Sequence, residues 1–168
     1  MTAARRNGKW LGPGYAFRGL IFCLAAALAA AAPLAAQTTE RIVVDRHTGL
    51  AIGGYDPVGY FTDGKPMPGR GDLEYRFAGA VWRFRNAGNR AAFIDRPEVY
   101  MPRFGGYDPT SIARGVATEG HPLIWLIAGT RLYLFHSTDE RSAFIADANA
   151  SLESAEAKWP SVERELVN

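Results

Sequence analysis

The sequence predicts an α+β domain in which two repeated β-hairpin–helix units pack together and a C-terminal helix follows them. Three observations lead to this fold class. A five-residue motif occurs twice, each copy precedes two short stretches of alternating apolar residues, and each pair of stretches precedes a helical pattern. The first unit covers residues 53–100, and the second covers residues 105–160.

The chain begins with a segment typical of exported proteins. Residues 1–36 carry four basic side chains and no acidic one, and a run of apolar and alanine residues follows the basic flank. This order predicts a secretory signal peptide over residues 1–36, a mature domain over residues 37–168, and a periplasmic or secreted location. The alternative is an uncleaved N-terminal membrane anchor, because the apolar run approaches the ~20 residues that span a bilayer.

Charge and cysteine content exclude two kinds of chemistry. Without residues 1–36 the chain keeps 15 basic residues against 17 acidic ones, a net charge of about −2. Such a balance offers no positive excess for phosphate groups, so we expect no nucleic-acid partner. The one cysteine, Cys23, lies inside the apolar run, so the mature domain has no thiolate for catalysis, metal binding or a disulfide.

The repeated motif is Gly-Gly-Tyr-Asp-Pro, at residues 53–57 and again at residues 105–109. Glycine permits unusual φ angles and Asp-Pro starts turns, so the motif predicts a tight turn. Its recurrence also allows a pocket shared by the two units. The residues of that pocket are Tyr55, Asp56, Tyr107 and Asp108.

The first unit predicts a hairpin with one apolar face, because apolar and polar residues alternate on both sides of a turn at residues 78–79. Pairing across a two-residue turn places Tyr75 opposite Trp82 and Leu73 opposite Phe84. These apolar side chains therefore share one face, as in a half-buried hairpin.

The second unit predicts a hairpin over residues 123–136 that is apolar on both faces. We expect such a hairpin to be covered on both sides and to lie at the centre of the fold. One extra residue near its turn would explain why the spacing between the units changes from 50 to 51 residues.

Helices follow both hairpins. The first begins at an N-cap, Asn86, and stops before Pro97, and the second begins at a capping box over residues 137–140. A last helical segment over residues 152–159 ends at Pro160, because proline interrupts helices.

The order of motifs resembles the YHS domain family, including its longer, exported members, and the likeness covers essentially the whole mature chain. The residues that carry it are Tyr55-Asp56-Pro57-Val58-Gly59-Tyr60-Phe61, Trp82-Arg83-Phe84, Arg90, Phe93, Pro97 and Tyr100 in the first unit, followed by Gly105-Gly106-Tyr107, Leu132-Tyr133-Leu134-Phe135 and Ala157-Lys158-Trp159-Pro160. The resemblance implies a compact hairpin-and-helix fold similar to small metal-binding modules, in which cysteines hold the metal.

The cysteine-type site of that family is absent from this chain. The first unit has Gly59, Arg85 and Asn89 where compact members have cysteine, and none of these is a thiolate. The resemblance therefore does not supply a metal site in the first unit.

The second unit offers a different candidate metal site. His136 and Glu140 lie four residues apart at the start of a helix, and Asp108 would supply a third ligand for a copper or zinc ion. The alternatives are a capping role for Glu140 and a strand-end role for His136. The two other histidines, His47 and His121, are expected to be exposed in polar or loop segments.

These observations predict a non-catalytic periplasmic module that binds a metal ion or a small ligand. The first alternative is an envelope domain that binds or supports a protein partner without a ligand, and it requires an exposed apolar patch. The second is a hydrolase that uses Asp56 and Asp108 as paired carboxylates, although no motif for a nucleophile or a cofactor accompanies them.

Overall fold

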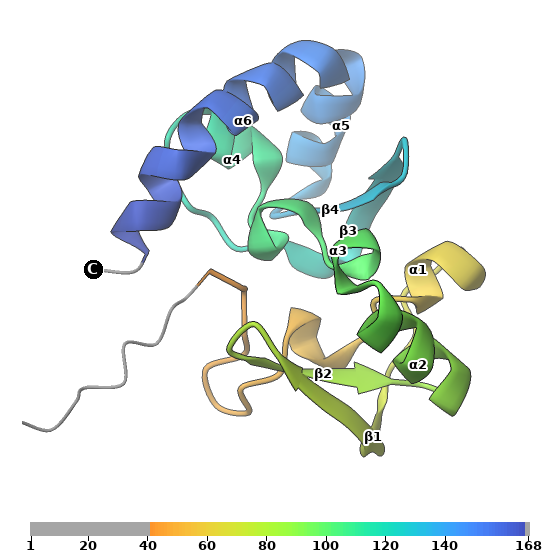
Figure 1. Cartoon of the computed structure of the whole chain (residues 1–168). Helices are drawn as coiled ribbons and strands as arrows, with labels where there is room; N and C mark the ends of the chain where they lie inside the picture. The colour runs from red at the N-terminus through yellow and green to blue at the C-terminus, as the bar shows by residue number, and fades with distance from the viewer. Residues whose placement is uncertain (1–40, 167–168) are drawn as a thin grey trace, which may run out of the picture. The chain divides into compact units, whose positions relative to one another are not determined.

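The structure, a computed structural model, describes residues 41–166, so the predicted signal peptide lies outside the described residues. The described residues form an α+β domain with two separate antiparallel hairpins and several helices, which agrees with the α+β part of the predicted fold class (Figure 1). Among these residues no helix has the length and the apolar content needed to cross a membrane.

The elements follow one another in the same order in each half. The first half contains η1 (Ile52–Gly54), α1 (Gly59–Thr62), β1 (Arg70–Phe77), β2 (Ala80–Phe84), α2 (Ala87–Asp95) and α3 (Pro97–Tyr100). The second half contains η2 (Arg103–Gly106), α4 (Pro109–Ala113), β3 (His121–Ala128), β4 (Arg131–Phe135), α5 (Thr138–Ala146) and α6 (Ala148–Glu165).

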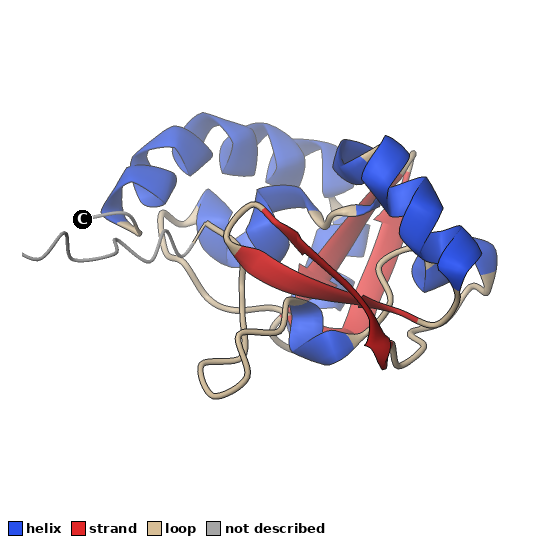
Figure 2. Ribbon diagram, turned by 60° about the horizontal axis from the view of Figure 1, so that its bottom comes forward, coloured by secondary structure: helices blue, strands red, loops and turns tan. Residues whose placement is uncertain are grey.

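The hairpin β3–β4 lies between two hydrophobic cores, which confirms its predicted central place. Leu132 and Leu134 of β4 contribute to a core with β1, β2 and α2, whereas Tyr133 and Phe135 contribute to a core with α4, α5 and α6. Alternate residues of a strand point to opposite faces, so one buried strand serves both cores. Figures 1 and 2 show this hairpin with the α4–α6 group on one side and β1–β2 on the other.

The hairpin β1–β2 covers one core with one face, as the alternation predicts. Tyr75 lies opposite Trp82, as predicted, and Trp82 is fully buried. The predicted pairing of Leu73 with Phe84 is wrong, because a bulge in β1 places Arg70 opposite Phe84. A bulge adds residues to one strand only, and alternation alone does not reveal it.

The two hairpin turns have the same length, so the predicted extra residue in the second turn is wrong. Phe77 pairs with Ala80 and Ala128 pairs with Arg131, which leaves two residues in each turn. The apparent extra residue arises because the glycines of the two turns, Gly79 and Gly129, do not occupy the same turn position. Glycine is the second residue of the turn at 78–79 but the first residue of the turn at 129–130, and both glycines have positive φ.

The final helix is longer than predicted. It begins after the N-cap Asp147 and continues through Pro160 to Glu165. Proline removes one backbone hydrogen bond from a helix, but Trp159 and Val162 on either side of it pack into the core beneath α6. Tertiary packing therefore maintains the last turn.

The predicted N-caps Asn86 and Ser137 are confirmed, since each accepts a hydrogen bond from the third backbone amide after it. The predicted capping role of the Glu140 side chain is wrong, because its carboxylate binds Thr110 and Arg114.

The first described residues are bound tightly to the second glycine-rich motif. The amide of Val43 donates to the carbonyl of Gly105 at 2.8 Å, and a Cβ atom at Gly105 would overlap the carbonyl oxygen of Arg41. Gly53 occupies the same place in the first motif with almost the same φ, 61° against 63°, but a Cβ atom there would make only ordinary contacts, with Pro122 at 3.5 Å and the Tyr55 ring at 3.8 Å.

This difference predicts unequal effects of one substitution at the two motifs. Gly53→Ala should lower the free energy of unfolding by about 1 kcal/mol, the cost of a left-handed φ for alanine. Gly105→Ala should lower it by about 2 kcal/mol more, because the segment around Arg41 must move away. Denaturant unfolding of both variants measures the difference, and equal losses would show that the close approach contributes nothing.

Candidate functional site

The aspartates of the two glycine-rich motifs are structural anchors. Asp56 and Asp108 are both fully buried. A buried carboxylate is tolerated only when its oxygens accept hydrogen bonds, and both residues satisfy this condition with groups of their own half.

Asp56 ties the turn before the first hairpin to the segment after it. Its Oδ1 accepts from the amide of Val58 at 2.9 Å, and its Oδ2 accepts from the amide of Arg85 at 2.8 Å and from Nδ2 of Asn89 at 2.7 Å. Arg85 and Asn89, two positions at which the resemblance to YHS domains implies cysteine, thus serve this anchor. The guanidinium of Arg85 also pairs with Asp63 at 2.5 Å. Neither side chain is free to hold a metal.

Asp108 makes the corresponding connection in the second half. Its Oδ1 accepts from the amide of Thr110, and its Oδ2 accepts from the amide of His136 at 2.7 Å. The Thr110 hydroxyl lies between Oδ1 of Asp108 and the Glu140 carboxylate, so its one proton is shared between these two acceptors. The hydroxyl oxygen lies 2.6 Å from Oε2 of Glu140, and Arg114 pairs with the same carboxylate at 2.8 Å. Hydrogen bonds from Arg114 and Thr110 hold the pKa of Glu140 below its usual value.

The three candidate metal ligands are thus neighbours in a hydrogen-bond network. The structure connects Asp108 to the backbone of His136 and, through Thr110, to the side chain of Glu140. It does not present them as a set of free donors. Across residues 41–166 no group of three or more His, Cys, Asp or Glu side chains is placed to hold a metal ion.

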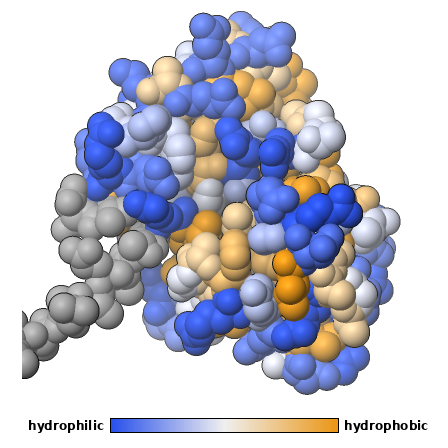
Figure 3. All heavy atoms as spheres, in the orientation of Figure 1, coloured by the Kyte–Doolittle hydropathy of each residue, from blue (hydrophilic) through white to orange (hydrophobic). Residues whose placement is uncertain are grey.

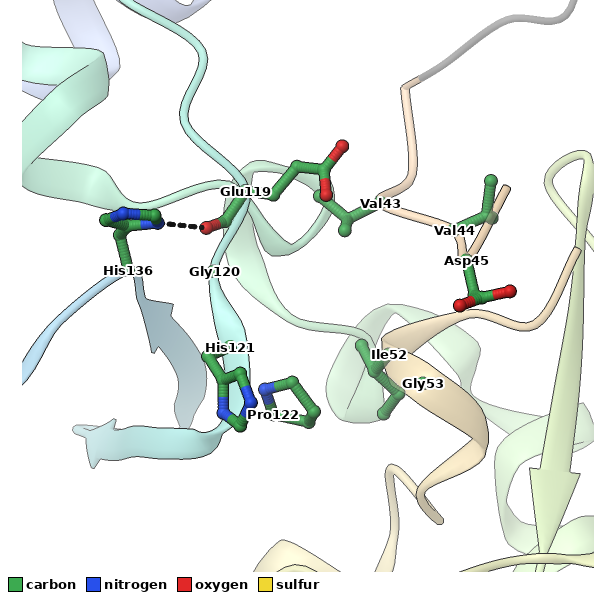
Figure 4. Close-up of a pocket in the computed structure, with 10 residues that line it drawn as sticks. All are labelled: Val43, Val44, Asp45, Ile52, Gly53, Glu119, Gly120, His121, Pro122 and His136. Atoms are coloured by element: carbon green, nitrogen blue, oxygen red, sulfur yellow. Dashed lines mark hydrogen bonds between the residues drawn. The ribbon is translucent and has the colours of Figure 1, made fainter. Parts of the chain in front are cut away.

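A cavity of about 350 Å³ lies elsewhere, between the first described residues and the start of β3 (Figure 4). One side comes from residues 43–45 and from Ile52 and Gly53, and the opposite side comes from residues 119–122 and from His136. The buried Tyr60 hydroxyl donates to the carbonyl of Pro122 at 2.8 Å and so fixes this second side to the first half of the domain.

A hydrogen bond to the backbone fixes the tautomer of the His136 ring. Its Nδ1 lies 3.2 Å from the carbonyl oxygen of Glu119, as the dashed line in Figure 4 marks. A carbonyl oxygen only accepts hydrogen bonds, so Nδ1 carries the proton. In the neutral ring Nε2 is then an acceptor, available to a ligand.

The ring of His121 is held as the other tautomer. Its Nδ1 accepts from the amide of Leu123 at 3.2 Å, so in the neutral ring Nε2 carries the proton and is a donor. The two histidines therefore present one acceptor and one donor. Each ring nitrogen that contacts the backbone fixes the role of the other nitrogen, a relation that governs what a histidine can bind.

The residues of the predicted shared pocket are not brought together at this cavity. Among its lining residues in the described part of the chain, Tyr55, Asp56, Tyr107 and Asp108 do not occur. Tyr55 packs against the first core, and Tyr107 is buried in the second core beside Trp159.

Sequence reasoning missed three polar residues of the cavity: Asp45, Glu119 and His121. His121 is exposed, as expected, yet it lines the cavity. No sequence pattern pairs Asp45 with Glu119, because they belong to distant segments that only the folded chain brings together. The His121-Pro122 pair at the start of an apolar strand is the one local signal that was present.

The network around Glu140 predicts a pH-dependent part of the stability. Because the folded state lowers the pKa of Glu140, its charge stabilises the fold above the ordinary carboxyl value of 4.5, and this contribution disappears as pH falls through the lower, folded value. Glu140→Gln should lower the free energy of unfolding at pH 7 by about 0.5–1 kcal/mol, and the difference from the natural chain should shrink as pH falls below the ordinary value of 4.5. Unfolding titrations from pH 7 to pH 3 measure this.

Asp139→Asn is the matched control, since Asp139 lies in the same first turn of α5 and is exposed. A pH-dependent loss of the same size in that variant would assign the effect to the helix terminus and not to the network.

Comparison of the chain with known proteins gives no match to a family model, a curated protein or a solved structure.

Proposed function

We propose that this chain is an exported, non-catalytic binding module of the YHS type, and that it holds a small ligand in the cavity between residues 43–45 and the start of β3. The observation that carries the proposal is the pair of histidines on the cavity wall. Backbone groups hold His121 and His136 in opposite tautomers, so Nε2 is a donor in one ring and an acceptor in the other, and both residues line the same cavity. Few but well-placed polar groups in a mostly apolar hollow are typical of ligand sites.

The proposal includes an origin of the domain from two related units. Three similarities support it: both halves have the same order of elements, both hairpins bulge at the same distance from the turn, and the two motif aspartates both bind the amide after the hairpin. The likeness of the first half to YHS domains and the predicted signal peptide support the family and the exported location.

A small ligand agrees better with the geometry than a metal ion does. A metal ion needs several donors directed at one point, and the described residues provide no such group. The carboxylates of Asp56 and Asp108 are also fully buried and occupied, so a hydrolytic role for this pair has no accessible acid or base.

A second candidate function is the binding of a protein partner, and one observation favours it. The strand β3 has no Asp, Glu, Lys or Arg among its eight residues, and its Leu123 is 50% exposed. Strands of this kind are suited to pair with another chain. On the face drawn in Figure 3, however, apolar and hydrophilic residues are interspersed.

The test uses the full chain and asks whether anything binds to this cavity. Binding of a mixed library of small cationic, neutral and anionic compounds, and of Cu²⁺, Zn²⁺ and Ni²⁺, is followed by NMR at the amides of Gly53 and Gly120. We expect compounds that move these signals, and we expect His121→Ala and His136→Ala to weaken their binding by about fivefold, the loss of one hydrogen bond.

His47→Ala is the matched control, because His47 is the remaining histidine and is exposed. It should bind every compound as the natural chain does. If no compound or ion perturbs the cavity amides, the ligand-binding function is wrong and the partner-binding alternative replaces it.

A further inference from the structure

The charged side chains on the cavity wall are of one sign. The acidic residues Asp45 and Glu119 line the cavity, and within the described chain no lysine or arginine is among its lining residues. The two carboxylates, with no Lys or Arg beside them in the lining, make this wall negatively charged. Such a wall attracts a cation and repels an anion.

The carboxylate of Asp45 is held in its charged form and keeps one oxygen available. Its Oδ1 accepts from the amide of His47, the amide of Thr48 and the hydroxyl of Thr48, at 2.8–3.0 Å. These hydrogen bonds, above all that of the Thr48 hydroxyl, lower the pKa of Asp45. Because all three bonds go to Oδ1, Oδ2 can accept from a ligand.

The acceptors outnumber the donors on this wall. The carboxylates of Asp45 and Glu119 and the Nε2 atom of His136 accept hydrogen bonds, whereas Nε2 of His121 donates. A ligand that carries several N–H donors matches this arrangement, and a carboxylate or phosphate does not.

The rest of the wall is apolar. Its members are Val43, Val44, Ile52 and Pro122. This surface suits the short hydrocarbon part of a ligand, and a volume of about 350 Å³ lies at the small end of the range for ligand sites.

From these observations we infer that the ligand is a small organic ammonium ion with a short apolar body. The inference rests on the proposed function of the cavity and adds the chemical class of its ligand. The carboxylates of Asp45 and Glu119, on opposite sides of the cavity, attract the ammonium group, and the hydrocarbon part lies against the valines, Ile52 and Pro122.

Three probes with one common body test the charge requirement: isopentylammonium, isopentanol and isovalerate. Each is titrated into the full chain at pH 7 while the amides of Gly53 and Gly120 are followed by NMR. The ammonium ion should bind with a dissociation constant in the millimolar range or tighter, the alcohol more weakly, and the acid most weakly.

Two variants locate the charge. Asp45→Asn retains the oxygen that accepts from Thr48, and Glu119→Gln retains the length of the side chain. Each should weaken binding of the ammonium ion by about 2- to 5-fold, the range for exposed ion pairs, and should leave isopentanol unchanged. Glu153→Gln removes the same charge at an exposed position of α6 and should change neither.

The outcomes separate the two claims. If isopentanol or isovalerate moves the cavity amides as strongly as the ammonium ion, or if the two variants bind it like the natural chain, the ammonium inference is wrong while the cavity remains a ligand site. If none of the three probes moves these amides, the inference is wrong, and the library experiment alone then decides the proposed function.

Discussion

In each half of the domain, a buried aspartate accepts hydrogen bonds from the turn that precedes a hairpin and from the amide that follows it. Asp56 binds the amide of Arg85, and Asp108 binds the amide of His136. Hydrogen bonds to a charged group are stronger than neutral ones, and an unpaired buried carboxylate is costly. These two contacts therefore fix where each hairpin ends and where the following helix begins.

The same contact places the candidate site. Because the amide of His136 is bound to Asp108, the His136 ring lies at the end of β4, where its Nδ1 meets the carbonyl of Glu119. The opposite wall depends on the segment around Val43, whose amide is held by Gly105. Hydrogen bonds inside the two halves thus determine the tautomer of His136 and the positions of the cavity walls.

The two halves use equivalent positions for different purposes. Asn89 reaches its aspartate directly, whereas Glu140 contacts Asp108 through the hydroxyl of Thr110 and pairs with Arg114. Asn89 and Glu140 are thus held in these networks and are not free to bind a metal. The binding chemistry that we propose lies instead on the cavity residues Asp45, Glu119, His121 and the ring of His136.

The sequence by itself determined the two hairpins with their following helices, the N-caps Asn86 and Ser137 and the central place of β3–β4, because each depends on local spacing: an alternation, a cap residue, or an apolar pattern on both faces. It could not determine the bulge opposite Phe84, the passage of α6 through Pro160 or the place of the turn glycine at residue 129, because these depend on pairing and packing with other segments. The cavity, too, could not be predicted from the sequence. Asp45 and Glu119 carry no mutual signal in the sequence, and only the clamp of the first described segment onto Gly105 brings them to opposite walls.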